Sequence, residues 1–227
     1  TAGSGKSVYD LVKGLDRTIF DPEICCFHDK GTFFKEVEAL GIPIHLFPFT
    51  TNYRPWVTFL PRVFKIKRFF KKHQFDVIHS WHWSSDISEP LAAKLASIPF
   101  VYTKKAMGWN NRYWSWRSKL SAKVIVVNED MVQLYFSKML HKIEKFPLAI
   151  DTNYYQPSET VPNIKQDLDI KNEDFVVLTI ANMVAVKGIE ILIEAVKKCK
   201  DDSIKVIIVG NDTSELNGIL VSEFPSP

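Results

Sequence analysis

Apolar positions recur along the chain in two rhythms. Short β-rich runs predict buried strands, and apolar residues at i, i+3, i+4 and i+7 predict amphipathic helices. The runs expected to form strands are Glu23–His28, Pro43–Phe47, Asp76–Ser80, Phe100–Thr103, Lys123–Val127, Lys142–Ala149, Phe175–Ala181 and Ile204–Val209. The stretches expected to form helices are Lys6–Leu15, Thr32–Leu40, Trp56–His73, Ser84–Ala96, Arg112–Leu120, Glu129–Leu140 and Lys187–Lys200. Strands that alternate with helices imply parallel sheets, so the pattern predicts an α/β fold.

The chain is expected to have two domains of this kind. Residues 151–162 (DTNYYQPSETVP) are polar, contain two prolines and show no periodicity, as is typical of a linker. We therefore expect a first Rossmann-like domain at 1–149, a linker at 150–162 and a second, incomplete Rossmann-like domain at 163–227. The chain opens with Thr1 rather than Met, and we expect it to be a fragment.

Composition narrows the class of protein. The 227 residues are 46% hydrophobic and 24% charged, which excludes a disordered or fibrous chain. Three cysteines are too few for a disulfide framework, which favours a reducing, cytoplasmic compartment. No apolar run approaches the ~20 residues of a membrane span.

Charge is distributed unevenly along the chain. Residues 1–149 hold 22 basic and 13 acidic side chains (net +9), while 150–227 hold 7 and 13 (net −6). This asymmetry indicates an anionic partner for the first domain.

Ligands of open α/β sheets bind outside the carboxyl ends of the strands, so the residues there are candidates. His79 and His82 end one strand beside two tryptophans, and His82, further into the loop, is the better ligand candidate. Lys104 and Lys105 directly follow the next expected strand and form a positively charged site suited to phosphate. His79 fits a packed structural group equally well.

The loop between a strand and a helix in the second half is a further candidate. It runs from Ala181 to Gly188, with Asn182 near its start and Lys187 beside the helix. Free N–H groups and the helix dipole favour an anion at such a place, and Lys187 adds a full positive charge.

The string Gly3-Ser4-Gly5-Lys6-Ser7 resembles the end of a phosphate-binding P-loop. The first glycine of that pattern would precede Thr1, and no strand ends in an aspartate that could hold Mg²⁺. A glycine loop that opens a helix is the favoured interpretation, and a P-loop ATPase or kinase is the alternative.

A basic stretch lies on the helix expected at Trp56–His73. Its apolar stripe is expected to consist of Phe59, Leu60, Val63 and Phe64. Its basic residues are Arg62, Lys65, Lys67, Arg68, Lys71 and Lys72. The helix could lie peripherally on an anionic membrane surface or present a merely solvated face. Nothing else in the chain favours nucleic acid.

In their order, several segments resemble the glycosyltransferases of the GT-B fold, in the retaining family-four group that uses nucleotide sugars. The matching segments are AGSGKSVYDLVKGL, DVIHSWH, KVIVVNEDM, FPLAIDTNYYQP and ANMVAVKGIEILIEAV. The resemblance implies an acceptor-side first domain and a donor-side second domain. It also implies transfer of a sugar to an acceptor hydroxyl, in polysaccharide or glycolipid assembly, with no metal or other cofactor.

The resemblance also implies roles for particular residues. Lys187 would stabilise the leaving diphosphate, and His82 would line the acceptor side. Donor contacts would come from the glycine loop, the paired lysines and the second-half loop: Gly3, Gly5, Lys104, Lys105, Asn182, Lys187 and Gly188.

The chain departs from the family pattern in several places, among them Leu148-Ala149, where the family has Asn-Gly, and Lys104-Lys105, where it often has a histidine. Asn182 stands where the family has an arginine, and Glu215 and Glu223, although spaced like the family glutamates, follow the preceding strand too closely and are interpreted as surface residues. A catalytically inactive binding fragment is therefore a second alternative.

Overall fold

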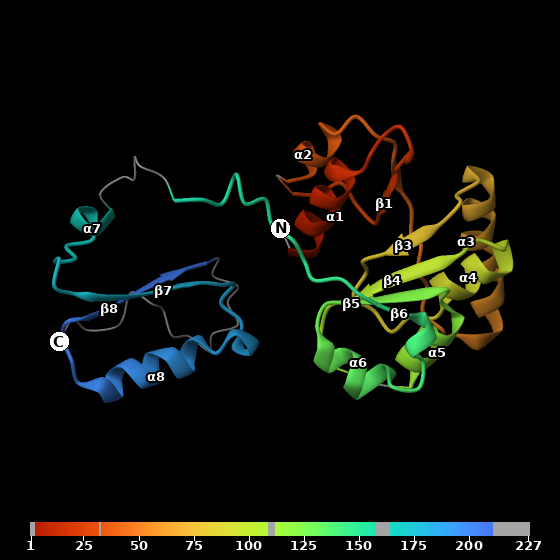
Figure 1. Cartoon of the computed structure of the whole chain (residues 1–227). Helices are drawn as coiled ribbons and strands as arrows, with labels where there is room; N and C mark the ends of the chain where they lie inside the picture. Colours follow the sequence, from red (N-terminus) through yellow and green to blue (C-terminus); the bar gives the residue numbers. More distant parts are fainter. Residues whose placement is uncertain (1–2, 32, 109–111, 158–163, 211–227) are drawn as a thin grey trace. The chain divides into compact units, whose positions relative to one another are not determined.

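A computed structural model describes residues 3–31, 33–108, 112–157 and 164–210 (Figure 1). The chain divides into two compact units, Thr1–Tyr155 and Gln156–Pro227, which we call unit 1 and unit 2. The division falls inside the polar segment 151–162. Glu215 and Glu223 lie outside the described residues.

Unit 1 alternates helices and strands over its whole length. Its helices are α1 (Gly3–Gly14), α2 (Phe34–Glu38), η1 (Trp56–Thr58), α3 (Phe59–His73), α4 (Ser88–Ala96), α5 (Tyr113–Leu120), α6 (Glu129–Phe136) and η2 (Leu140–Lys142). Its strands are β1 (Ile24–Cys26), β2 (Ile44–Leu46), β3 (Ile78–Ser80), β4 (Phe100–Lys104), β5 (Lys123–Val126) and β6 (Ile143–Lys145).

All the strand pairs described in unit 1 are parallel, which confirms the α/β prediction. One sheet consists of β1 and β2, and the other has the order β3-β4-β5-β6. The strands are shorter than the apolar runs predicted. The strand expected at Lys142–Ala149, for example, pairs only over Ile143–Lys145.

The core of unit 1 lies where α3 and α4 pack together beside the four-stranded sheet (Figure 1). The buried stripe of α3 consists of Phe59, Val63, Ile66 and Phe70, which is a helical spacing. The predicted stripe was wrong at two positions. Leu60 and Phe64 are 54% and 41% exposed, because the stripe follows positions 59, 63, 66 and 70 and turns them to the solvent face.

Two helix starts differ from the prediction for identifiable reasons. Helix α4 begins at Ser88 rather than Ser84, because the Asp86 carboxylate accepts the backbone N–H groups of Ser88 (3.0 Å) and Glu89 (3.3 Å). Helix α1 already begins at Gly3, so Gly3 and Gly5 lie in its first turn and not in a loop.

Unit 2 consists of α7 (Ile164–Asp167), β7 (Phe175–Ile180), η3 (Ala185–Lys187), α8 (Ile189–Cys199) and β8 (Ile204–Val209). Strands β7 and β8 pair in parallel over their whole length. At the end of this pair, a Cβ added to Gly210 would lie 1.8 Å from the Ala181 carbonyl oxygen. Only glycine permits that approach of the two backbones.

Among the helices in the described part of the chain, none combines the length and the apolar character needed to cross a bilayer.

Candidate functional site

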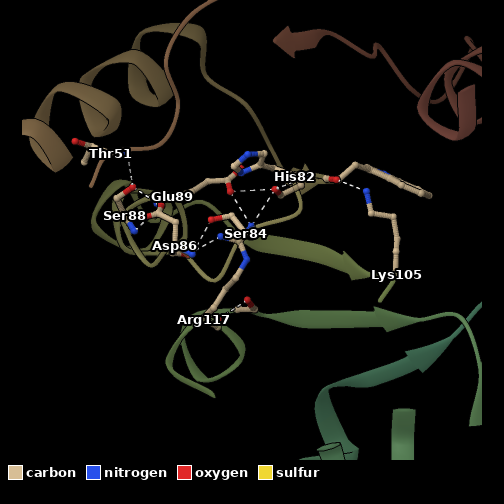
Figure 2. A network of polar contacts seen from close by, with 11 residues as sticks. Thr51, His82, Ser84, Asp86, Ser88, Glu89, Lys105 and Arg117 are labelled. Atoms are coloured by element: carbon tan, nitrogen blue, oxygen red, sulfur yellow. Dashed lines mark hydrogen bonds and ion pairs between the residues drawn. The ribbon is translucent and has the colours of Figure 1, made fainter. Parts of the chain in front are cut away.

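The turn from β3 to α4 is organised around a buried ion pair between Arg117 of α5 and Glu89 of α4 (Figure 2). The two side chains are 0% and 3% exposed, and Arg117 Nη2 lies 2.7 Å from Glu89 Oε2. Burial raises the pKa of the Glu89 carboxyl, and the guanidinium beside it counters this effect. Because a buried charge without a partner is costly, each residue holds the other in place.

Arg117 also binds the turn itself. Its guanidinium donates to the Asp86 carbonyl oxygen at 2.6 Å and to Ser80 Oγ at 3.0 Å, and Ser80 Oγ donates to Glu89 Oε2 at 3.0 Å. Ser80 Oγ in turn accepts the backbone N–H of His82 at 3.4 Å. The network therefore holds both ends of the segment that carries His82.

His82 is set up as an uncharged imidazole. Burial lowers the pKa of His82, and the charges of Arg117 and Lys105 lower it further. Its ring meets the edges of Phe27 and Phe49, with ring centres 5.2 and 5.7 Å away. Among the described residues, Nδ1 of this ring has no hydrogen-bond partner although it is buried. A neutral imidazole can take a hydrogen bond or a proton from a ligand.

The preceding histidine, His79, is a packed structural residue. Nε2 of His79 lies 2.8 Å from Thr103 Oγ1 on the neighbouring strand β4, and burial lowers the pKa of His79 to about 4. This satisfied, neutral ring fits a packed group rather than a ligand-binding one.

The adjacent lysines at the end of β4 point to different surroundings. Lys105 Nζ donates to Ser4 Oγ (2.5 Å) and to the Trp81 carbonyl oxygen (2.6 Å), which ties α1 to the β3–α4 turn. Lys104 is 1% exposed, donates to the Gly108 carbonyl oxygen at 2.7 Å and lies over the Trp114 ring. Burial lowers the pKa of Lys104 to about 8.

The structure thus separates two ammonium groups that the sequence places together. Successive side chains of an extended segment alternate in direction, which explains the separation. The donor-binding role of both lysines stays a prediction.

The first turn of α1 lies beside this region. Gly3 has nothing within 4 Å of an added Cβ, and Lys105 binds the intervening Ser4. Lys6 pairs with the Asp10 carboxylate one turn further along the helix. Because Gly3 and Ser4, which a P-loop would place in the loop that cradles the phosphate, are already helical, the P-loop alternative has no support in the structure.

A hollow of about 2210 Å³ within unit 1 is lined by several of these candidates, although not by Lys104 or Lys105. Its lining includes Ser4 and Gly5 of α1, His79 and Ser80 of β3, and His82 of the following turn. The structure therefore brings His82 and the start of α1 together at one end of β3 and β4.

The candidates of unit 2 lie in the turn from β7 to α8. Asn182 and Lys187 are exposed, and Gly188 adopts a left-handed backbone (φ 65°) that favours glycine. The Gly188 carbonyl accepts the N–H groups of Ile191 and Leu192, so α8 starts there. The first N–H groups of a helix lack partners within it, which leaves an anion-binding end beside Lys187.

Sequence reasoning missed the ion pair and the residues around it. Arg117 and Glu89 are 28 positions apart, and only the fold shows that they meet. Asp86-Ile87-Ser88-Glu89 does carry the spacing of a helix-capping signature, which signals where α4 begins.

Comparison with protein families gives two consecutive matches. Residues 1–154 match the model described as Glycosyltransferase Family 4, and residues 160–219 match the model described as Glycosyl transferases group 1. Comparison with curated protein sequences finds no match.

Solved structures show the same fold at low identity. Alr3699/HepE of Anabaena in complex with UDP-glucose is 21% identical over 92% of this chain and 57% of its own, with a TM-score of 0.69. A glycosyltransferase from Rickettsia africae ESF-5 is 20% identical over 93% of this chain and 57% of its own, with a TM-score of 0.71. These likenesses confirm the GT-B fold prediction. The chain spans 57% of the length of these relatives.

The buried His79 predicts a pH dependence of stability. Its pKa is about 4 in the folded chain and near 6.5 when unfolded, so between these values only the unfolded chain binds the proton. Stability attributable to His79 is thus present above pH 6.5 and is lost as the pH falls toward 4. His79→Gln should remove on the order of 3 kcal/mol of the stability difference between pH 7 and 4.

Urea unfolding at both pH values measures this difference. His141→Gln, which changes an exposed histidine, serves as the control and should leave the difference unchanged. Equal differences in His79→Gln and the parent chain would refute the assignment.

Proposed function

The chain belongs to Glycosyltransferase Family 4, and from this premise we propose that it provides the acceptor side and part of the donor side of a sugar transferase. The proposed reaction moves a hexosyl group from a nucleoside diphosphate sugar to an acceptor hydroxyl, in polysaccharide or glycolipid assembly. The observation that carries the proposal is the succession of two glycosyltransferase family matches, one on each unit.

The donor is proposed to bind at the turn between β7 and α8. The start of α8 offers unpaired N–H groups, Gly188 lets the chain turn there, and the exposed Lys187 adds a full charge. A diphosphate is the kind of anion that such an end binds. The relative Alr3699/HepE, solved with UDP-glucose, supports a uridine nucleotide and a hexose as first candidates.

The acceptor is proposed to bind at the end of β3, where His82 accepts a hydrogen bond from its hydroxyl. In the reaction, the acceptor oxygen forms a bond to the anomeric carbon as the bond from that carbon to the diphosphate breaks. The hydroxyl proton passes to the neutral His82 imidazole, and negative charge develops on the departing diphosphate. Lys187 and the start of α8 stabilise that charge.

Replacement of Lys187 tests the donor site. Lys187→Ala should weaken binding of UDP to this chain by about tenfold, because one charge-assisted contact is worth roughly 1.5 kcal/mol. Isothermal titration measures the change.

The matched control is Lys198→Ala, which removes the same charge at the other end of α8 and should leave binding unaltered. Equal affinity in the parent and Lys187→Ala would contradict the proposed diphosphate contact.

The alternative is a module that binds its ligands without turning them over. We propose this for the 227-residue chain by itself, because Asn182 replaces a family arginine at the donor turn. An assay for UDP-glucose hydrolysis or transfer by this chain separates the two, and measurable turnover would favour the enzyme.

A peripheral membrane contact at the cytoplasmic face is proposed for η1 and α3. The exposed apolar side chains there are Trp56, Val57, Leu60 and Phe64, of which Val57 is 87% exposed. Exposed basic residues on the same helix are Lys65, Arg68, Lys71 and Lys72. Arg62 is not counted among them, because its guanidinium binds within the protein. It donates to the carbonyl oxygens of Asn52, Arg54 and Pro55. An apolar ridge flanked by cations suits an anionic bilayer surface.

Vesicle co-sedimentation tests this contact. Changing Lys65, Arg68, Lys71 and Lys72 together to Gln should lower binding to phosphatidylglycerol-containing vesicles by at least about tenfold, because each basic residue near an anionic surface is worth roughly 1 kcal/mol. Lys13, Lys30, Lys35 and Lys138, changed together, provide exposed controls of equal charge. Binding that does not depend on the anionic lipid would rule the contact out.

A further inference from the structure

Three potential metal ligands from different parts of unit 1 meet at one point. Glu23 directly precedes β1, His45 lies in β2, and His73 is the last residue of α3. One ligand atom from each lies within 4.8 Å of the others. Glu23 contacts the His45 ring through Nε2, and the two histidine ring centres are 4.3 Å apart. Residues 22 and 28 positions apart in sequence thus converge at one point of unit 1.

The cluster lies at the opposite end of the strands from the proposed reaction. Glu23 comes before the first residue of β1, and α3 ends at His73 shortly before β3 begins. The candidate acceptor residue His82 comes after the carboxyl end of β3. This inference therefore goes beyond the proposed transfer reaction and does not depend on it.

Neighbouring aromatic rings restrict the two imidazoles. The His73 ring stacks on Phe75, with centres 5.6 Å apart and planes 11° apart, and the Phe69 edge meets His45 at 5.5 Å. The side chains of His45 and Glu23 are 18% and 26% exposed, so the site is sheltered yet open to an ion from solvent. Restricted rings lose little freedom when they bind a metal.

The chemistry of the three ligands selects the metal class. Two imidazoles and one carboxylate are a zinc-binding set that leaves the fourth tetrahedral position to water. With zinc–ligand distances near 2.0–2.1 Å, ligand atoms lie roughly 3.3 Å apart, so small side-chain rotations that separate Glu23 from His45 and bring the more distant atoms closer give the spacing of a zinc site.

We propose that Glu23, His45 and His73 bind one Zn²⁺ ion that links the β1–β2 sheet to the end of α3. The ion replaces the direct contact between Glu23 and His45 and joins the paired strands β1 and β2 to α3, which His45 otherwise meets through ring contacts. Its role is to stabilise unit 1.

Titration of the 227-residue chain with ZnCl₂ after treatment with a chelator tests the proposal. One ion should bind per chain, and zinc at 100 times its Kd should raise the Tm by at least about 5 °C. His45→Gln, His73→Gln and Glu23→Gln should each weaken zinc binding by at least about tenfold, since even an outer partner of a ligand is worth that much. Each variant should keep the far-UV circular dichroism spectrum and the metal-free Tm of the parent chain. If one variant does not, the comparison rests on the other two.

Control variants separate this site from other zinc ligands of the chain. His141→Gln should bind zinc as the parent does, and so should a chain with Cys25, Cys26 and Cys199 changed to Ser. Co²⁺ in place of zinc should give the visible spectrum of a tetrahedral site without a thiolate charge-transfer band. Absence of stoichiometric zinc binding, or binding that survives the histidine changes but is lost with the cysteines, would overturn the proposal.

Discussion

The buried ion pair between Arg117 and Glu89 is the constraint on which the rest of unit 1 depends. Both charges have left water, so each is tolerable only while the other stays within hydrogen-bond distance. Arg117 also donates to Ser80 Oγ and to the Asp86 carbonyl oxygen, at the two ends of the β3–α4 turn. A connection that would otherwise be a surface loop is thereby fixed to α5.

The ion pair and its hydrogen bonds fix the position of His82. The backbone N–H of His82 is held by Ser80, its ring packs against two phenylalanines, and burial keeps it neutral. Lys105 extends the same arrangement to the start of α1 through Ser4. The candidate acceptor site is thus positioned by the charges of Arg117 and Glu89, which are buried beneath it. In unit 2 the proposed donor site consists of the left-handed Gly188 and the start of α8.

The sequence predicted the parts of this molecule that local rules govern. Alternation of strands and helices and the turn before α8 follow from periodicity and backbone chemistry. It failed where long-range packing decides. Leu60 and Phe64 carry no local sign of exposure, and Lys104 and Lys105 differ only in which side of the chain is buried. The meeting of Arg117 with Glu89, and of Glu23 with His45 and His73, likewise requires the fold.

The most direct test of the central constraint is a double-mutant cycle on Arg117 and Glu89, measured by urea unfolding. All six tryptophans lie in residues 1–155, so tryptophan fluorescence reports unit 1. Arg117→Met and Glu89→Gln should each cost about 3–5 kcal/mol, because each leaves a buried polar group without its partner. The double variant should cost clearly less than the sum of the two. Single costs below about 1 kcal/mol, or strictly additive ones, would show that the pair does not organise the turn.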